Sequence, residues 1–483
     1  MLYGSTRGGS FDVTALEAIL RGIAPDGGLY VPENIPDLSG LKGESFLQTA
    51  RQILAALFPE FALQAEAMAG KAYAGHFSHP DITPLVPVGD SHVLELFHGP
   101  TAAFKDVALC ALPLMMNAAR ERTGDTDEIL ILTATSGDTG SAALAGFREV
   151  SGIRILVFYP EDGVSPVQKA QMVTMAGKNL KVCGVRGNFD DAQTGVKEVF
   201  ASYQPPEGLA LSSANSINIG RLVPQMTYYF TAYAALVRQG AIQSGDQVNF
   251  VVPTGNFGDI LAGYLAKKAG LPVGKLVCAA NANDVLKDFI QTGLYDRRRA
   301  LRQTLSPSMD ILVSSNLERL LYFVSHDPAF IAGCMEQLRT QGFYQVPKEY
   351  MEQIRETFLT GACSDGEGLD AIEKVWQRHH YLMDPHTAAA WKVKEELEQS
   401  GRLPGANVVL STASPFKFPG AMAKALGLAL NDDASAAEIL GQRLGLPVPQ
   451  SLTGLQAKPV LHQDVIDPRD MLAYVQNKAV GSW

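Results

Sequence analysis

Apolar residues gather in continuous runs that are separated by turns and by stretches with helical spacing. The run EILILTA, which starts at residue 128, is followed by the turn TSGDTG, an Ala-rich helical stretch and a second apolar run, IRILVFYP. Continuous apolar runs are typical of parallel strands that are buried on both faces of a sheet. The pattern therefore predicts a β-α-β unit from about Glu128 to Phe158.

The same order recurs later in the chain. Residues 247–281 contain an apolar run, the Gly-rich turn PTGNFGD, a helical stretch and another apolar run, and a third strand-like run, ANVVLSTASPF, covers residues 406–416. From residue 11 to about residue 87, helical stretches are broken by APDGGLYVPENIP, whose Pro, Asp and Gly residues we predict to be turn material. Together these patterns predict an α/β protein with two sheets or lobes.

The pattern also divides the chain into units. We predict an N-terminal domain over residues 1–90, a central core over residues 91–430 with a smaller lobe at about 128–200, and a C-terminal extension over residues 431–483. A length of 483 residues with 46% hydrophobic residues agrees with this division, because one domain usually holds about 100 to 200 residues.

Composition narrows the range of functions. The formal net charge of −10 opposes nonspecific binding to nucleic acid or to an anionic membrane, so a small anionic substrate would need a local cluster of donors. The five cysteines lie far apart without CxxC spacing, which favours free thiols over a disulfide framework or a zinc site. No apolar signal region and no run of about 18 apolar residues is present. We therefore expect a cytoplasmic protein.

Polar residues follow three of the predicted strands, at residues 135–140, 254–259 and 411–414. In open α/β sheets, ligands bind beyond the carboxyl ends of the strands. Gly255 and Gly258 in PTGNFGD let backbone N–H groups approach an anion, and the following helix adds the positive end of its dipole. This turn predicts a phosphate site, although an ordinary strand-to-helix turn would have the same residues.

Lys105 lies in HGPTAAFKD, directly after the apolar run VLELF. A lysine among small and aromatic neighbours has a lowered pKa, and its neutral amine can attack a carbonyl and carry protons. The alternative is a surface lysine that pairs with Asp106. A lysine that forms an imine, together with a separate phosphate site, is what pyridoxal 5'-phosphate (PLP) requires.

At these motifs the chain resembles the threonine synthases, PLP enzymes of fold type II, the fold of the tryptophan synthase β-subunit. The resemblance is to the longer bacterial and fungal class. It is carried, in family order, by STRG (5–8), IAPDGGLYVPE (23–33), ELFHGPTAAFKD (95–106), TATSGDTGSAA (133–143), NSINIGRLVPQ (215–225), VPTGNFGD (252–259), SPSMDILVSSNLERL (306–320), DPHTAAA (384–390) and STASPFKFP (411–419). The implied reaction converts O-phospho-L-homoserine and water into L-threonine and phosphate by γ-elimination and β-addition of water.

The resemblance also implies roles for individual residues around the cofactor. Lys105 would be the Schiff-base lysine, Phe104 would shield it from water, and Thr412, with Ser411 as second choice, would face the pyridine nitrogen. A carboxylate at Asp138, beside the ring hydroxyl, would either accept a hydrogen bond from that hydroxyl or need another cation. The cofactor phosphate would be held by Thr254, Gly255, Asn256, Phe257 and Gly258.

Two further segments would bind the substrate. Ser136, Gly137 and Thr139 would hold its α-carboxylate, although the same loop is also expected to cap a helix. Asn215, Ser216 and Arg221 would hold its phosphate, with Arg221 able to donate two parallel N–H bonds. Without the resemblance, the second segment would be read as a structural polar turn.

One departure from the family pattern affects the pocket wall. Relatives commonly have STAHPAKF, whereas this chain has Ser414 and Phe416 in the corresponding stretch. Two alternatives stay open: a threonine-synthase-like phospho-lyase that releases a keto acid, and a PLP-fold protein that has lost catalysis and only binds. We expect a small-molecule substrate, no metal and a monomer or homodimer, and we assign no role to His98 or His386.

Overall fold

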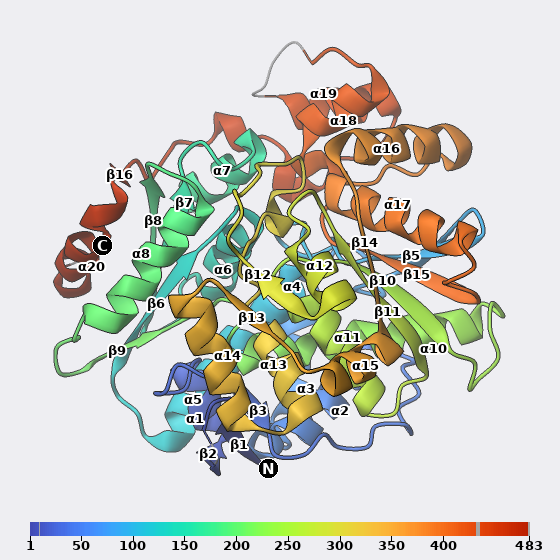
Figure 1. The fold of residues 1–483 in the computed structure, drawn as a ribbon. Coiled ribbons are helices and arrows are strands. Elements are labelled where there is room, and N and C mark those ends of the chain that lie inside the picture. The colour runs from blue at the N-terminus through green and yellow to red at the C-terminus, as the bar shows by residue number, and fades with distance from the viewer. Residues whose placement is uncertain (9, 431–434, 482–483) are drawn as a thin grey trace.

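The computed structural model describes residues 1–8, 10–430 and 435–481, and it contains two main sheets flanked by helices (Figure 1). The larger sheet has the strand order β14-β11-β10-β15-β5-β4, and all neighbours are parallel except β4 and β5. Its strands are β4 (Leu85–Val88), β5 (Ser91–Glu95), β10 (Val248–Pro253), β11 (Val273–Ala280), β14 (Phe358–Ala362) and β15 (Ala406–Ser411).

The smaller sheet is parallel throughout, in the order β16-β8-β7-β6-β9. Its strands are β6 (Glu128–Ala134), β7 (Ile153–Pro160), β8 (Leu180–Val185), β9 (Leu209–Ser212) and β16 (Val465–Ile466), and the helices between them are α6 (Asp138–Phe147), α7 (Pro166–Val173) and α8 (Phe189–Ser202). The predicted α/β fold with two mostly parallel sheets is confirmed.

Helices cover both faces of the larger sheet. Helix α17 (Pro385–Gln399) packs against β10, β11 and β15, while α10 (Met226–Arg238) and α11 (Gly258–Lys268) lie on the opposite side (Figure 1). Every residue of β10 is buried, as its continuous apolar run predicts. The other elements of the core are α4 (Lys105–Leu109), α5 (Leu112–Thr123), α9 (Ile219–Leu222), α12 (Val285–Thr292), β12 (Leu294–Asp296), α13 (Leu317–Ser325), α14 (Pro328–Thr340), β13 (Phe343–Gln345), α15 (Lys348–Thr357), α16 (Asp365–His379) and α18 (Pro419–Leu426).

The N-terminal segment forms a small antiparallel sheet in the order β2-β1-β3, with three helices beside it. Its elements are β1 (Leu2–Ser5), β2 (Phe11–Thr14), α1 (Ala15–Arg21), β3 (Tyr30–Pro32), α2 (Phe46–Leu57) and α3 (Ala65–Tyr73). The prediction that the Pro, Asp and Gly residues within 24–36 are turn material is wrong for Pro32, which ends β3. A three-residue strand has no periodicity of its own, and β3 forms because β1 supplies its hydrogen bonds.

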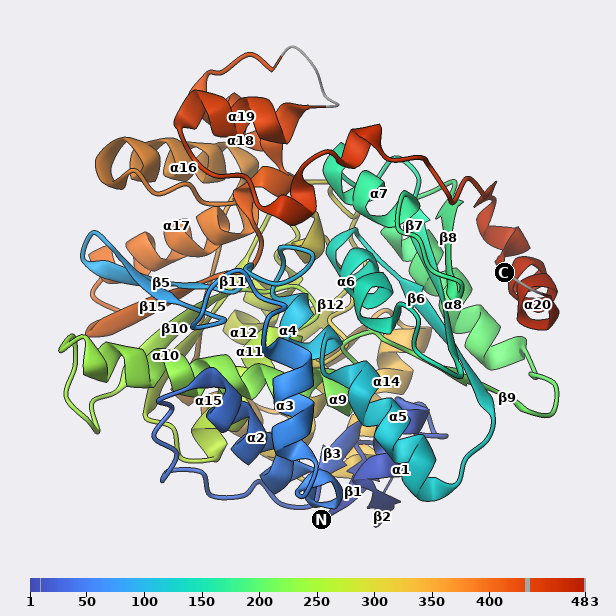
Figure 2. The same ribbon diagram turned by 180° about the vertical axis from the view of Figure 1, so that it is seen from behind.

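The C-terminal segment joins the two sheets. After α19 (Ala436–Leu444), which lies beside α18, the chain crosses to the smaller sheet, where β16 adds an edge strand and α20 (Met471–Val480) packs on α8 (Figure 2). The predicted start of a C-terminal extension at residue 431 lies outside the described residues, and the division into units stays a prediction. Within the ranges that the structure describes, none of the helices combines the length and apolar character needed to span a bilayer.

Candidate active site

A cavity of about 1110 Å³ receives side chains from both sheets. The carboxyl ends of β6 and β10 face it, which is where a ligand site is expected in open α/β sheets. The predicted site residues in its wall are Phe104, Lys105, Ser136, Thr139, Asn215, Ser216, Arg221, Thr254, Gly255, Asn256, Phe257, Gly258 and Thr412. Gly137 and Asp138 do not line the cavity themselves, but Oδ2 of Asp138 lies 3.8 Å from Nζ of the cavity residue Lys105.

Lys105 is the first residue of α4, and it is only 9% exposed. Its Nζ lies 4.3 Å from the centroid of the Phe104 ring and 3.8 Å from Oδ2 of Asp138. Asp106, the partner in the alternative interpretation, instead accepts hydrogen bonds from N and Oγ1 of Thr101, at 2.9 and 2.6 Å. Lys105 is therefore a cavity lysine and not half of a surface pair with its neighbour.

The electrostatic surroundings of Lys105 favour its neutral form. Burial is the largest cause that lowers its pKa, to about 8, and the nearby cations Lys417 and Arg221 act in the same direction. The carboxylates of Asp138 and Asp259 act against them. At neutral to mildly alkaline pH, an appreciable fraction of this amine is thus unprotonated and able to bond to a carbonyl.

Thr412 is held next to Lys105 by the backbone. The N–H of Phe104 donates to the carbonyl oxygen of Thr412 at 2.8 Å, which clips the segment before α4 onto the end of β15. Thr412 lines the cavity, whereas Ser411 accepts a hydrogen bond from Thr387 at 3.0 Å. This placement favours Thr412 over Ser411 as a cavity hydroxyl.

The turn between β10 and α11 passes so close to the backbone of Ser308 that only glycine fits at position 255. A Cβ on Gly255 would lie 2.5 Å from the carbonyl oxygen of Ser308, so the chain there is already in close contact. Phe257 has φ +61° and precedes Gly258, the first residue of an 11-residue helix. Oδ1 of Asn256 is buried without a hydrogen-bond partner among the described residues. A helix N-terminus and a tight Gly turn both present backbone N–H donors, and together they make a cradle for a phosphate.

In the turn between β6 and α6, some polar groups form hydrogen bonds within the turn and others line the cavity. Oγ1 of Thr135 accepts hydrogen bonds from the N–H groups of Gly137 and Gly140, at 2.9 and 2.8 Å. Ser136 and Thr139 instead lie in the cavity wall. The helix-capping interpretation and the ligand interpretation of TSGDTG thus apply to different residues of the same turn.

Arg221 is 2% exposed and forms no ion pair with any carboxylate in the described part of the chain. One Nη donates to the carbonyl oxygen of Ala214, while Nε is buried and has no hydrogen-bond partner in the ranges that the structure describes. Oδ1 of the neighbouring Asn215 is also unpartnered, and Oγ of Ser216 accepts a bond from Asn316 at 3.1 Å. Burial lowers the pKa of Arg221 to about 10. A buried guanidinium without an anion is costly, so this position is suited to bind one.

Sequence reasoning missed three buried ionisable residues near the cavity. Lys417 forms an ion pair with Asp138, with 2.7 Å between Nζ and Oδ1. Asp259 accepts hydrogen bonds from the hydroxyls of two tyrosines, at 2.6 and 3.0 Å. His386 contacts Asp384 through Nδ1 at 2.7 Å. Their positions in sequence motifs could have indicated them. Lys417 stands between two phenylalanines in PFKF, Asp259 ends GNFGD, and His386 follows an aspartate in DPHT.

Comparison with known proteins bears on the whole chain. The profile of the family "Pyridoxal-phosphate dependent enzyme" matches residues 83–414, and profiles for the "Threonine synthase N terminus" and "Threonine synthase, C-terminal" match residues 2–71 and 387–471. The threonine synthase of Schizosaccharomyces pombe is 38% identical over 466 residues, which cover 89% of each chain. The chain belongs to the threonine synthase family. As in other threonine synthases of this fold, its cofactor is PLP.

Two other similar proteins are informative. The crystal structure of PLP-bound threonine synthase from Brucella melitensis has a TM-score of 0.85, with 38% sequence identity and full coverage of both chains. Human threonine synthase-like 1 is 40% identical, and the match covers 89% of this chain but 61% of the human protein. The threonine synthase fold thus extends over the whole chain. The chain is about as similar in sequence to a threonine synthase-like protein as to the threonine synthases.

The residues in the cavity fit PLP. The backbone N–H groups of the turn from Gly255 to Gly258, at the N-terminus of α11, suit its phosphate, the weakly basic Lys105 suits its aldehyde, and the hydroxyl of Thr412 suits its ring nitrogen. Arg221 is left for a second anion. The assignment of each contact to the cofactor or to the substrate stays a prediction.

Proposed function

We propose that the protein is a threonine synthase that converts O-phospho-L-homoserine and water into L-threonine and phosphate. The observation that carries this proposal is the coexistence, in one cavity, of Lys105 with a lowered pKa and of Arg221 as a buried cation without a carboxylate. A PLP enzyme that acts on an uncharged side chain would need the first residue only. A substrate with its own phosphate ester needs both.

When bound, PLP supplies an aldehyde that bonds to amines and a conjugated ring that accepts electron density from the substrate's α carbon. The chain's own residues do the rest. Lys105, as a neutral amine, takes the α proton and carries protons among the substrate's carbons. Arg221, with Asn215 and Ser216, holds the ester phosphate and stabilises the charge that develops as it leaves. Ser136 and Thr139 orient the α-carboxylate.

Product analysis tests the proposal directly. Purified protein with PLP and O-phosphohomoserine is expected to release L-threonine and phosphate in equal amounts, as measured by amino-acid analysis and a phosphate assay. Lys105→Ala is the control, because it removes the amine and leaves the cavity wall otherwise intact. Release of phosphate without threonine, or equal turnover by the control, contradicts the proposal.

A second function is favoured by a specific observation at the departure from the family pattern. Ser414 is 1% exposed, and its Oγ is buried without a hydrogen-bond partner among the described residues, so the pocket wall differs in polarity from a wall with histidine there. This altered wall keeps a phospho-lyase as the alternative. Such an enzyme would release a keto acid, ammonia and phosphate from the same substrate and water. The product analysis above distinguishes the two.

A binding protein without catalysis is the third possibility, and it is less well supported because Lys105 and both anion sites are retained. An absorbance scan of the PLP-loaded protein separates it from an enzyme, since a lysine bonded to PLP absorbs near the visible edge. A cytoplasmic location and a monomeric or homodimeric state stay predictions from the sequence.

A further inference from the structure

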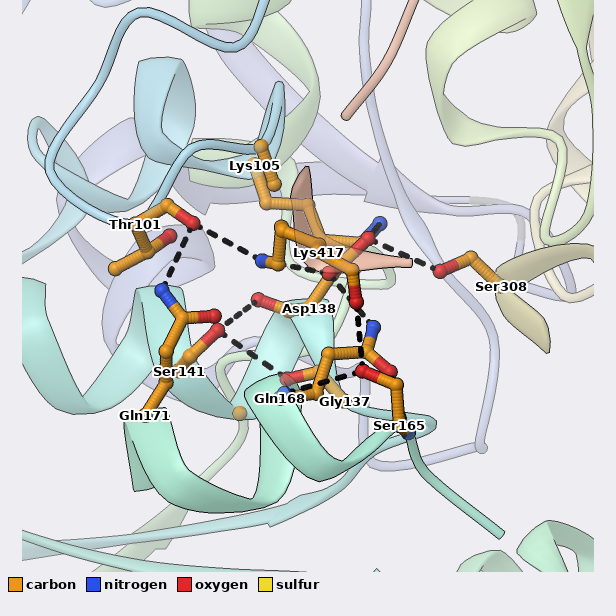
Figure 3. A network of polar contacts seen from close by, with 12 residues as sticks. Thr101, Lys105, Gly137, Asp138, Ser141, Ser165, Gln168, Gln171, Ser308 and Lys417 are labelled. Atoms are coloured by element: carbon orange, nitrogen blue, oxygen red, sulfur yellow. Dashed lines mark hydrogen bonds and ion pairs between the residues drawn. The ribbon is translucent and has the colours of Figure 1, made fainter. Parts of the chain in front are cut away.

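Lys417 lies in a short turn directly after β15, and its side chain is fully buried. Its Nζ pairs with Oδ1 of Asp138 at 2.7 Å and donates to the carbonyl oxygen of Thr101 at 3.0 Å (Figure 3). No carboxylate besides Asp138 forms an ion pair with Lys417 in the described part of the chain. Asp138 is therefore the carboxylate that pairs with Lys417, and it also lies beside Lys105.

Asp138 is shared between two lysines. Oδ1 is held by Lys417 and by Nε2 of Gln168, at 2.7 and 2.9 Å, whereas Oδ2 faces Nζ of Lys105 at 3.8 Å and Oγ of Ser308 at 3.3 Å (Figure 3). The contact with Lys417 has the length of a charge-assisted hydrogen bond, and the contact with Lys105 does not. One oxygen of the carboxylate is thus saturated by Lys417.

The charges of the three side chains explain why this arrangement matters. Asp138 and Lys417 together are neutral, so a protonated Lys105 adds a buried positive charge, and no second carboxylate of the described residues forms an ion pair with it. Without Lys417, the same proton on Lys105 would neutralise Asp138, and the buried pair would hold it. Burial alone disfavours the carboxylate of Asp138, but Lys417 first, then Lys105 and His386, lower its pKa and keep it ionised.

We propose that Lys417 is a positioning residue for the reaction: it occupies the carboxylate of Asp138, so that Lys105 is left as a free amine for the cofactor's aldehyde. This inference rests on the proposed function, in which Lys105 bonds to PLP. The charged groups that face Lys105 are Asp138, Lys417, Arg221 and Asp259. A purely structural Lys417, which would only tie the end of β15 to Thr101, would affect stability and leave the proton affinity of Lys105 unchanged.

The test measures the proton affinity of Lys105 in the full-length chain after removal of PLP. Acetic anhydride reacts with neutral amines, so the acetylation rate of Lys105 as a function of pH, measured by mass spectrometry against the exposed Lys348, gives the midpoint. In the wild type it is expected near pH 8. In Lys417→Met it rises by at least one pH unit, which lowers the rate at pH 8 at least fivefold, because Asp138 then pairs with Lys105. Lys417→Arg keeps the charge and keeps the midpoint near the wild-type value.

A matched control is Lys394→Met. Lys394 is also buried and paired, with Ser91 and Glu398, but it lies outside the cavity wall, so this variant leaves the midpoint of Lys105 unchanged. An unchanged midpoint in folded Lys417→Met, or equal shifts in the Met and Arg variants, overturns the proposal.

A second pair of variants covers the case in which Lys417→Met does not fold. Asp138→Asn removes the shared carboxylate and leaves two lysines, so the midpoint falls below the wild-type value. The double variant Lys417→Met/Asp138→Asn has neither charge, and its midpoint lies below that expected of Lys417→Met alone. A midpoint in Asp138→Asn at or above the wild-type value overturns the proposal. If the midpoints shift as expected but no threonine forms, the proposed function fails and the electrostatic role stands.

Discussion

At the scale of single residues, Arg221 is the position where a phosphate-binding role and a structural role predict the most different results. Arg221→Ala removes a charge-assisted contact to the ester and to the departing phosphate, so kcat/KM for O-phosphohomoserine is expected to fall by roughly 2 to 4 kcal/mol of transition-state stabilisation. Inhibition by free phosphate is lost, while PLP affinity is retained. Steady-state kinetics with a phosphate inhibition series measures both effects.

The control for this prediction is Arg120→Ala. Arg120 donates to the carbonyl oxygens of Ser151 and Asp127, at 3.3 and 2.8 Å, and also has an unpartnered buried Nε, but it lies outside the cavity wall. Its loss lowers the melting temperature without changing phosphate inhibition. The same pattern in Arg221→Ala would mean that Arg221 only stabilises the turn at Ala214.

Asp259 gives the protein a pH-dependent stability. Two tyrosine hydroxyls bind its Oδ1, Oδ2 has no partner among the described residues, and burial raises its pKa to about 6. Folding therefore favours its protonated form, and this contribution is complete below the unfolded pKa of 3.8 and lost as the pH rises through 6. Since one pKa unit corresponds to about 1.4 kcal/mol, Asp259→Asn is expected to gain about 3 kcal/mol relative to the wild type between pH 4 and pH 7.

Urea unfolding of both cofactor-free proteins at several pH values measures this difference. Asn can accept the same tyrosine hydrogen bonds and does not titrate, so other carboxylates cancel in the comparison. If the free energies of unfolding of the two proteins change with pH in parallel, folding does not raise the pKa of Asp259, and the prediction is wrong.

At the scale of elements, the turn between β10 and α11 is expected to serve the cofactor more than the fold. In Gly255→Val, the added Cβ would lie only 2.5 Å from the carbonyl oxygen of Ser308. The turn must therefore shift, and its N–H groups move away from the phosphate. PLP affinity is expected to drop at least tenfold. Fluorescence titration with PLP measures this affinity. The control is Gly420→Val, because a Cβ added at this helix glycine would meet no atom within 4 Å.

Unchanged PLP affinity in a folded Gly255→Val variant would remove this turn from the cofactor site. A variant that loses helical circular dichroism and PLP binding together would instead indicate that the glycine is needed for folding.

The elements that could be predicted from the sequence are those whose burial is periodic or continuous. β6, β7, β10, β11 and β15 are continuous apolar runs because both faces of each strand are covered, and turn residues bound them. β3 and β16 could not be predicted, since strands of three and two residues form only through partners elsewhere in the chain.

The same distinction applies to the site. Residues in sequence motifs, such as Lys105 and Gly255, could be placed from the resemblance. Lys417 stands in the motif PFKF, but its role depends on Asp138, which is far away along the chain and follows a strand of the other sheet. The alternative that Asp138 needs another cation was open from the sequence, and the structure supplies that cation.

At the scale of the whole molecule, the C-terminal segment stabilises the smaller sheet from outside. Met471 of α20 is 1% exposed and packs on α8, where a Cβ on Gly195 would lie 2.2 Å from its sulfur. Met471→Ala is expected to lower the free energy of unfolding by about 2 to 5 kcal/mol, because it leaves a cavity under the helix. Thermal and urea unfolding measure the loss.

The exposed Gln476 on the same helix provides the control, since Gln476→Ala is expected to change stability by no more than about 0.5 kcal/mol. If Met471→Ala is equally mild, α20 contributes little to the fold and the smaller sheet is stable without it.

The position of β15 in the larger sheet has a consequence for the chain during synthesis. This strand lies between β10 and β5, and it is made long after both of them. At roughly 5 to 20 residues per second, β5 and β10 wait on the order of tens of seconds or less with the edges that β15 will cover still open. Open strand edges pair readily with other chains. The larger sheet of a nascent chain is therefore incomplete until β15 leaves the ribosome, and the lysine-bearing segment whose Phe104 N–H bonds to Thr412 takes its final place only then.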